Sequence, residues 1–203
     1  MAQEIKEFRG VENLVVAEVT KDASDEITFG AVEKLAGVAE ISKEAESSSE
    51  THYYDNAPLI VINSQGSDTV TIQASVLSLD MVAKITGRHY DDVKGMLVEG
   101  NRESKYFAIG YKTKATDGTY RYVWRLKGTF AIPNEDHQTE NDGTDANGQE
   151  LVFTGIQTTH KFTAGNGGAY AIVVDGAKTN DQAFFANVQT PDDFTPVTQS
   201  GNG

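Results

Sequence analysis

The stretch KYFAIGYKTKATDGTYRYVWRLKGTFAI, residues 105–132, decides the fold class of this chain. In its second half, large apolar side chains alternate with basic and polar ones. The apolar row consists of Tyr120, Tyr122, Trp124, Leu126, Phe130 and Ile132, with Gly128 in the same row. The opposite row includes Arg121, Arg125, Lys127 and Thr129. A period of two indicates a β-strand, so this half predicts a strand with one aromatic face and one basic face.

The first half of this stretch supplies the partner strand. Residues 105–114 precede Asp117 and Gly118, and an Asp-Gly dipeptide favours a tight turn between antiparallel strands. We therefore predict a long β-hairpin over residues 105–132, and we expect this hairpin to be the backbone of the fold.

Strand-like patterns recur away from this hairpin. They cover residues 11–19, 35–45, 58–63, 68–76, 149–162 and 169–174. The third and fourth of these flank the tetrapeptide SQGS, which is typical of a turn, so together they predict a second hairpin. The stretches predicted as loops are 21–31, 87–103 and 133–148.

One α-helix is predicted between Ser78 and Gly87. Ser78 suits the N-cap, Asp80 lies in the first turn, an apolar stripe follows, and Gly87 suits the C-terminal end. A shorter helix is predicted over residues 181–188.

Together these patterns predict a mainly β protein. We expect a β-sandwich or barrel-like fold with one flanking α-helix, a long hairpin and extended loops and arms. Its predicted parts are an N-terminal arm at residues 1–9, a β-sandwich domain at 10–175 and a C-terminal arm or tail at 176–203.

The composition excludes several classes of protein. The 203 residues include no cysteine, so neither a disulfide framework nor a thiolate metal site is possible. The N-terminus has no basic segment followed by an apolar run. The longest apolar stretch, residues 59–62, is far short of a membrane span. These features predict a soluble, non-exported protein.

The net charge of −13 is unevenly distributed. Residues 1–55 carry −8, residues 56–132 carry +3 and residues 133–203 carry −8. Such an acidic chain lacks the basic face with which nucleic-acid binders neutralise phosphates. Two interpretations stay open. The acids are either solvated surface residues, or the acidic and basic regions let copies of the chain meet with complementary potential.

No stretch predicts a metal site or a catalytic centre. Residues 141–150 partly resemble a calcium loop, but the positions of the first aspartate and the bidentate glutamate hold Gly143 and Thr154. The sequence has no nucleophile elbow, phosphate-binding loop or dinucleotide fingerprint. The four histidines share no short motif, and they are His52, His89, His137 and His160. We therefore predict a protein that is not an enzyme and has no cofactor or metal.

The run SSSETHYYDN, residues 47–56, combines two acids, a histidine and two adjacent tyrosines. Adjacent residues of an extended chain point to opposite sides, so one tyrosine can pack on its own domain while the other faces outward. Tyrosine suits an interface because it buries a large ring and keeps a hydroxyl for a hydrogen bond. The alternative is an ordinary loop tyrosine whose contacts lie within the fold.

Several long runs resemble the major tail protein, or tail tube protein, of long-tailed non-contractile (siphovirus-type) phages and prophages of Gram-positive bacteria. The similarity covers about residues 8–175. The runs that carry it are GVENLVVAEVT at 10–20, AEISKEAESSSETHYYDNAPLIVINSQG at 39–66, ITGRHYD at 85–91, KYFAIGYKTKATDGTYRYVWRLKGTF at 105–130 and NDGTDANGQELVFTGIQTTHKF at 141–162.

The resemblance implies a structural β-sandwich subunit that performs no chemistry. Six subunits are expected to form a ring, and rings to stack into the hollow tail tube of a virion made in the host bacterial cytoplasm. The implied partners are other copies of the chain, the tape measure protein, and the tail terminator and distal tail proteins. DNA passes through the lumen as transient cargo, and no membrane partner is implied.

The resemblance also implies a role for residues 47–58. They match the family's long loop between early strands, which reaches a neighbouring subunit. Two other functions stay open: an adhesion or carbohydrate-binding module with exposed aromatics such as Tyr53 and Trp124, and a metal-dependent hydrolase. The alternation places Trp124 in the core, which weakens the first. The implied subunit-interface residues are Glu50, His52, Tyr53, Tyr54, Asp55, Asn56 and Pro58.

Overall fold

The computed structural model describes residues 5–134, 148–165 and 167–197. Within these residues the chain forms eleven β-strands, two α-helices and one 3-10 helix. The strands are β1 (Phe8–Asp22), β2 (Ile27–Phe29), β3 (Glu33–Lys34), β4 (Val38–Tyr54), β5 (Ala57–Ala74), β6 (His89–Asp91), β7 (Met96–Val98), β8 (Phe107–Ala115), β9 (Tyr120–Phe130), β10 (Gln149–Gly155) and β11 (Ala171–Asp175). The helices are α1 (Leu79–Thr86), η1 (Gly176–Lys178) and α2 (Asp181–Phe185).

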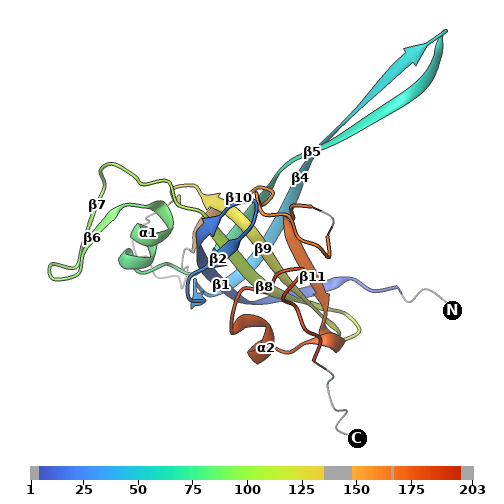
Figure 1. The fold of residues 1–203 in the computed structure, drawn as a ribbon. Coiled ribbons are helices and arrows are strands. Elements are labelled where there is room, and N and C mark those ends of the chain that lie inside the picture. Colours follow the sequence, from blue (N-terminus) through green and yellow to red (C-terminus); the bar gives the residue numbers. More distant parts are fainter. Residues whose placement is uncertain (1–4, 135–147, 166, 198–203) are drawn as a thin grey trace, which may run out of the picture.

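Most strands belong to one large antiparallel sheet (Figure 1). Its strand order is β2-β1-β8-β9-β10-β5-β4, and β11 pairs with β9 beside this path. β3 pairs with β1, while β6 and β7 form a separate small hairpin near α1. The chain is mainly β with one main helix, which confirms the predicted fold class.

The predicted central hairpin is present as β8 and β9. Tyr111 pairs with Val123 near its middle, and Gly118 in the turn has a left-handed backbone (φ 84°). Glycine suits this turn because it adopts a left-handed conformation without the steric cost of a Cβ.

The predicted helix is also present, as α1. Ser78 occupies the N-cap position, but its side chain does not accept a capping hydrogen bond from a backbone N–H of the helix. Gly87 ends the helix in a left-handed conformation, and a Cβ there would lie 1.9 Å from the carbonyl oxygen of Glu103. This helix end therefore requires glycine. α2 is shorter than predicted, and no helix in the described part of the chain is long and apolar enough to cross a membrane.

The body holds two apolar clusters. Ile72 and Phe153 belong to the first, to which α1 contributes Ile85. Trp124 belongs to the second, together with Phe184 of α2. Trp124 is 0% exposed, which confirms its predicted place in the core.

β9 does not keep one uniform alternation. Arg125 pairs with Ile109, whereas Gly128 pairs with Phe107, so β9 carries one extra residue between these two pairs. Such a bulge reverses the face that the following side chains occupy. Phe130 consequently lies in the first cluster, on the face opposite to the one predicted.

The basic face predicted for β9 is largely buried. The Arg125 guanidinium donates a hydrogen bond to Asp68 (2.8 Å), and Lys127 Nζ donates one to Asp22. Arg121 stays exposed. Both faces of this central strand are covered, so the charges on Arg125 and Lys127 require carboxylate partners.

The prediction of a second hairpin, formed by residues 58–63 and 68–76, is wrong. The segment SQGS continues the single strand β5, which pairs along its whole length with β4. A turn-like tetrapeptide stays extended here because the opposite strand offers backbone partners on both sides of it. The register shift between Ala45 and Ser47 absorbs one extra residue of β5 at this point.

Several other predicted boundaries differ from the structure. The predicted loop 21–31 contains β2, and the predicted loop 87–103 contains β6 and β7. The predicted strand 149–162 ends as β10 at Gly155. β2 pairs with the end of β1, and β6 pairs with β7, but each of these strands has only three residues. Three residues are too few for a clear alternation, so local pattern gave little indication of them. Most of the predicted loop 133–148 lies outside the described residues.

Both predicted arms meet the body in the described residues. β1 begins at Phe8, within the predicted N-terminal arm. In the predicted C-terminal arm, Phe184 is fully buried, and Val188 and Thr190 are nearly so. The segment that follows β11 therefore packs against the sheet through the second cluster.

Candidate functional site

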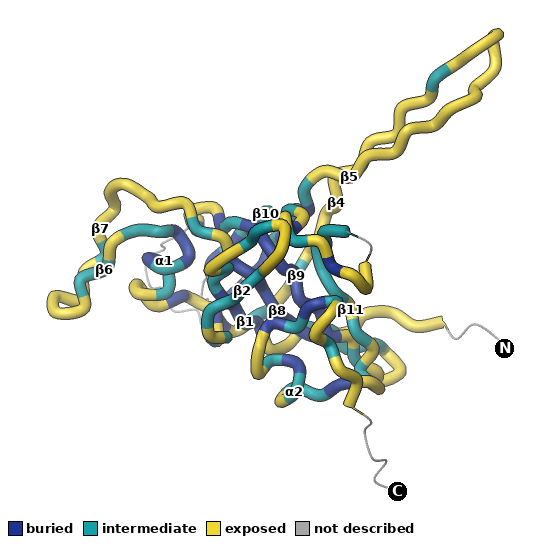
Figure 2. The backbone as a smooth tube through the Cα atoms, in the orientation of Figure 1, coloured by how far each residue is buried: buried dark blue, intermediate teal, exposed yellow. Residues whose placement is uncertain are grey.

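The outer part of the β4–β5 hairpin, residues 44–67, projects from the body as a two-stranded ribbon, which we call the arm (Figure 1). Residues 44–66 are exposed, apart from the half-buried His52 (Figure 2). About ten residues in each strand, at about 3.4 Å each, give the arm a reach of about 35 Å. The arm is therefore long relative to its width and is surrounded by solvent.

The root of the arm is fixed to the sheet by buried charge. Asp68 of β5 lies just inside the register shift, and its side chain is almost completely buried. Its carboxylate accepts a hydrogen bond from Arg125 of β9 at 2.8 Å, and Lys43 Nζ of β4 lies 3.5 Å away. A buried carboxylate requires such partners, so these contacts tie β4, β5 and β9 together where the arm leaves the body.

The arm ends in a two-residue turn at Asp55 and Asn56. Tyr54 pairs with Ala57, and both turn residues have positive φ, 51° and 63°. Positive φ at both central positions is the type I′ arrangement that matches the twist of paired strands. Asp and Asn are enriched in this backbone conformation among residues that carry a side chain. The Asp-Asn dipeptide therefore sets the end of the arm.

Large apolar side chains gather near this turn, and we call them the apolar tip. Four of them form the aliphatic run at residues 59–62. Successive residues of a strand point to opposite sides, so this run exposes apolar surface on both faces of the ribbon. Its cross-strand partners are the polar residues Glu50, Thr51 and His52. The apolar tip and its exposed fractions are Tyr53 (68%), Tyr54 (53%), Leu59 (66%), Ile60 (48%), Val61 (55%) and Ile62 (53%).

This exposure is unfavourable for a lone chain. Burial of one Leu, Ile or Val side chain contributes about 1.5–3 kcal/mol. An isolated two-stranded ribbon is marginally stable in water. The edges of the ribbon also present backbone groups that readily pair with another strand. The arm therefore has the physical character of a surface that another molecule covers.

The structure brings the predicted interface residues together at the end of the arm. The predicted loop is instead the end of a β-hairpin, with a register shift between His52 and Tyr53. The prediction that one tyrosine can pack on its own domain is wrong, because the ribbon carries both Tyr53 and Tyr54 away from the body and exposes them. The residues so gathered are Glu50, His52, Tyr53, Tyr54, Asp55, Asn56 and Pro58.

The aliphatic run at residues 59–62 was not predicted as part of the interface, because its residue types are those of a core strand. The sequence does carry a signal for its exposure. Its partner, residues 46–52 (ESSSETH), contains no aliphatic side chain that could pack against it.

The arm is also strongly acidic. No lysine or arginine occurs between Lys43 and Lys84, so no basic side chain of the arm offsets its acids. The arm therefore combines an apolar tip with a negative field along its length. Its acids are Glu44, Glu46, Glu50 and Asp55.

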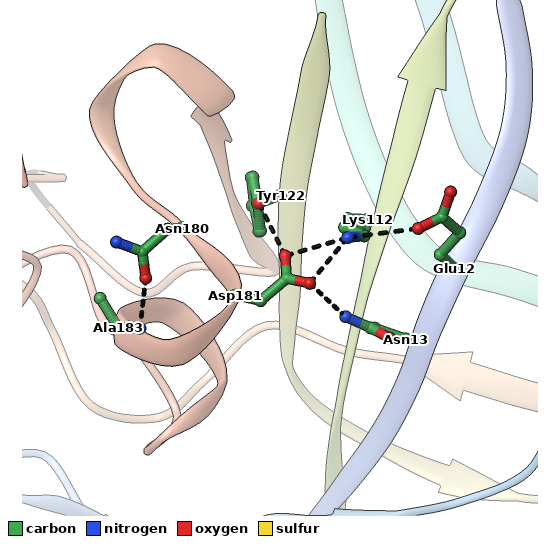
Figure 3. Close-up of polar contacts among 7 residues, drawn as sticks. All are labelled: Glu12, Asn13, Lys112, Tyr122, Asn180, Asp181 and Ala183. Carbon is green, nitrogen blue, oxygen red and sulfur yellow. Dashed lines mark hydrogen bonds and ion pairs between the residues drawn. The ribbon is translucent and has the colours of Figure 1, made fainter. Parts of the chain in front are cut away.

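A polar cluster centred on Asp181 lies elsewhere, between α2 and the sheet (Figure 3). The Asp181 carboxylate accepts hydrogen bonds from Lys112 Nζ (2.7 and 3.0 Å), Tyr122 Oη (2.7 Å) and Asn13 Nδ2 (2.8 Å). Glu12 adds a second carboxylate 3.2 Å from Lys112 Nζ. The cluster joins α2 to β1, β8 and β9, and it holds the C-terminal segment on the body.

The titratable groups of this cluster keep their usual charge states near neutral pH: Asp181 is ionised, Lys112 is charged and Tyr122 is neutral. Burial disfavours ionisation of Asp181, but hydrogen bonds from Lys112 and Tyr122 outweigh it and lower the pKa of Asp181. Burial also disfavours the charge on Lys112, yet its bonds to Asp181 and Glu12 raise the pKa of Lys112. Burial and the bond to Asp181 raise the pKa of Tyr122 well above its usual value. Such groups suit a structural clamp better than proton transfer.

The remaining candidates for metal ligands do not lie close together in the described residues. Within residues 5–134, 148–165 and 167–197, no three His, Asp or Glu side chains are placed to hold a metal ion. His52 lies on the arm, His89 in β6 and His160 beyond β10. His137 and most of the calcium-like stretch 141–150 lie outside the described residues.

No protein-family model matches the sequence, and no curated protein matches it. The class of this protein is described by its fold and its arm. It is a mainly β protein whose body packs around two apolar clusters and whose longest hairpin presents an uncovered apolar tip.

Proposed function

We propose that this chain is a tail tube subunit, a structural protein that assembles with copies of itself into stacked hexameric rings. The observation that carries the proposal is the arm, about 35 Å long, with six large apolar side chains exposed on its outer half. Such a surface is favourable when a neighbouring subunit covers it. The resemblance of the sequence to tail tube proteins selects this assembly among those that an apolar arm permits.

The edges of the sheet support the same proposal. β2 and β4 lie at the two ends of the strand order. Edge strands readily accept a further strand, so pairing between subunits would extend the sheet from one copy to the next. Six copies joined in this way would line a channel with a continuous sheet.

The acidic composition supports a lumen that passes DNA. Carboxylates repel phosphates, and salt confines this repulsion to about 8–10 Å. In the proposed tube, DNA is transient cargo and the tape measure protein fills the lumen during assembly. The tail terminator and distal tail proteins would contact its two ends, and the protein would be located in the virion tail.

The adhesion or carbohydrate-binding alternative has less support. Trp124 is fully buried, and its indole N–H donates to the carbonyl oxygen of Phe184 at 3.1 Å, so its ring is not available to a sugar. Tyr53 and Tyr54 are exposed, but they alternate across a narrow ribbon. Small-ligand sites are usually concave, and the arm is not.

Negative-stain electron microscopy of the purified protein, over a series of rising concentrations, tests the proposal. We expect rings and hollow tubes of uniform width at high concentration. Sedimentation velocity should show the monomer disappearing over the same range. A protein that stays monomeric at every concentration and never enters particles would falsify the proposal.

A further inference from the structure

A groove of about 450 Å³ opens on the body near the root of the arm. Its floor is a row across three paired strands, formed by Tyr111 of β8, Val123 of β9 and Val173 of β11. Val11 of β1 and Ile41 of β4 also line it. Both of these pack against the first apolar cluster, so the groove is an open extension of the core.

The mouth of the groove is apolar and basic. Phe8, at the mouth, is 65% exposed, and Val173, at the β11 end of the floor, is 62% exposed. The Arg121 guanidinium lies 5.1 Å from the centre of the Phe8 ring and makes no ion pair with any described residue. Lys43, whose Nζ lies 3.5 Å from Asp68, also lines the groove, and so does the acid Glu40. The free guanidinium therefore makes the mouth a site for an approaching carboxylate.

The arm complements this groove both in its apolar surface and in its charge. Its tip is apolar, and its charged side chains are acids, with Glu50 and Asp55 closest to the tip. Apolar surface that meets apolar surface supplies affinity, while opposite charges at the rim fix orientation and exclude wrong partners.

The arm does not reach the groove of its own chain. Lys43 lines the groove, whereas Tyr54 lies at the far end of the same strand, about 35 Å away. The ribbon points away from the body (Figure 1). We propose that the apolar tip of one copy occupies the groove of a second copy. This inference rests on the proposed function, because it names the surface that receives the arm.

The contact has a defined symmetry. Tip and groove are different surfaces on one chain, so the contact between two copies is head-to-tail and leaves one tip and one groove open. Repetition of such a contact produces a closed ring or an open filament rather than a two-fold dimer. Both products fit a tube built from many copies.

A second hollow, of about 530 Å³, is a poorer receptor for the arm. Leu79, Met96 and Ile132 are among its lining residues. Its charges are Arg88 and Glu99, which pair with each other at 2.8 Å. This hollow therefore offers an acidic arm less attraction than the groove beside Arg121.

Disulfide trapping tests the inference, and the chain is suited to it because it contains no cysteine. A Val61→Cys variant is mixed at assembly concentration with Val173→Cys, with oxidised glutathione as oxidant. Val93→Cys is the matched control, since Val93 is 96% exposed and lies away from the groove. Met96→Cys reports on the second hollow. Cross-linked pairs are identified by peptide mass spectrometry.

We expect the Val61–Val173 pair to form about 100-fold faster than the Val61–Val93 pair, because docking raises the effective concentration of the two thiols. Tubes that form without this cross-link, or that cross-link Met96 instead, would overturn the groove as receptor and leave the tail tube proposal standing. Failure of the unsubstituted protein to assemble at any concentration would overturn both.

A charge variant gives a second measurement. Arg121→Glu should raise the concentration needed for assembly and should leave the thermal unfolding of the monomer unchanged, since Arg121 is exposed. Lys94→Glu, on the β6–β7 hairpin, serves as the charge control. If both variants assemble like the unsubstituted protein, the basic mouth of the groove has no role in docking.

Discussion

The two halves of β5 have similar residue types and opposite surroundings. Val70 and Ile72, in the body, are 0% exposed, whereas Ile60 and Ile62, on the arm, are 48% and 53% exposed. All four belong to one strand and pair with the same neighbour, β4. The inner half also pairs with β10 along its other edge, and the two halves differ in what lies above and below the strand. In the body the rest of the fold covers it, and on the arm only solvent does.

This contrast shows that one hairpin serves two purposes. Its inner half stabilises the monomer, because its apolar side chains are removed from water on folding. Its outer half gains nothing comparable from folding, so its apolar side chains are available to stabilise an assembly. Substitutions in the inner half should therefore affect folding, and those in the outer half should affect assembly.

The largest expected effect on folding is at the junction of the two halves. Asp68→Ala leaves Arg125 buried without its carboxylate, and loss of one partner of a buried pair costs about 3–5 kcal/mol. Urea unfolding should show this loss. Glu50→Ala removes an exposed carboxylate from the arm and is the control. If both variants unfold at the same urea concentration, the junction does not anchor the hairpin.

A pair of isoleucines compares the two halves directly. Ile72→Ala should lower the free energy of unfolding by about 2–5 kcal/mol, because it leaves a cavity in the first apolar cluster. Ile62→Ala, on the arm, should change it by less than about 0.5 kcal/mol. Equal losses for the two variants, measured by urea unfolding, would show that the arm folds onto the body.

Acid should weaken the body through groups that the arm does not share. Burial opposes ionisation of Asp22, but hydrogen bonds from Lys127, Thr159 and His160 outweigh it and lower its pKa, as similar bonds do for Asp181. A lowered folded pKa means that this stabilisation is present above the unfolded pKa, near pH 4. It is lost as pH falls below that value through the folded pKa.

Thermal unfolding from about pH 6 to pH 2 measures this effect. Asp181→Asn should flatten part of the decline in melting temperature below about pH 4. Glu50→Gln, on the arm, should leave the decline unchanged. If Asp181→Asn leaves the decline in melting temperature unchanged, the polar cluster centred on Asp181 does not contribute to acid sensitivity.

The smallest expected effect on folding is at the two tyrosines. Replacement of both Tyr53 and Tyr54 by Ala should leave a folded protomer, because both rings are exposed. Ring and tube formation should be impaired, because large aromatic side chains contribute strongly at interfaces. Circular dichroism and electron microscopy of the same sample separate the two results. An unfolded double variant would place these rings in the core of the protomer.

Much of the body could be predicted from local sequence. The alternation from Tyr120 onward and the Asp-Gly turn defined the β8–β9 hairpin, and Gly87 defined the end of α1. Trp124 was correctly placed in the core. These features depend on backbone preference and on side chains close together in sequence, so a local pattern is enough to find them.

The arm could be predicted only in part. The residues at its end were identified, but local periodicity did not show that SQGS continues a strand, nor that residues 59–62 are exposed. Both facts depend on what lies against the strand, which local periodicity does not record. The bulge in β9 was missed for the same reason, because a register shift is defined by the partner strand.

The most direct measurement compares sedimentation velocity of the unsubstituted protein with that of an Ile60→Asp, Ile62→Asp variant over the same concentrations. These side chains lie on one face of the apolar tip, so two carboxylates there should prevent its burial against another copy. We expect the unsubstituted protein to assemble and the variant to remain monomeric, with the same melting temperature for both monomers. Assembly of the variant at the same concentration as the unsubstituted protein would contradict a role for the arm in assembly.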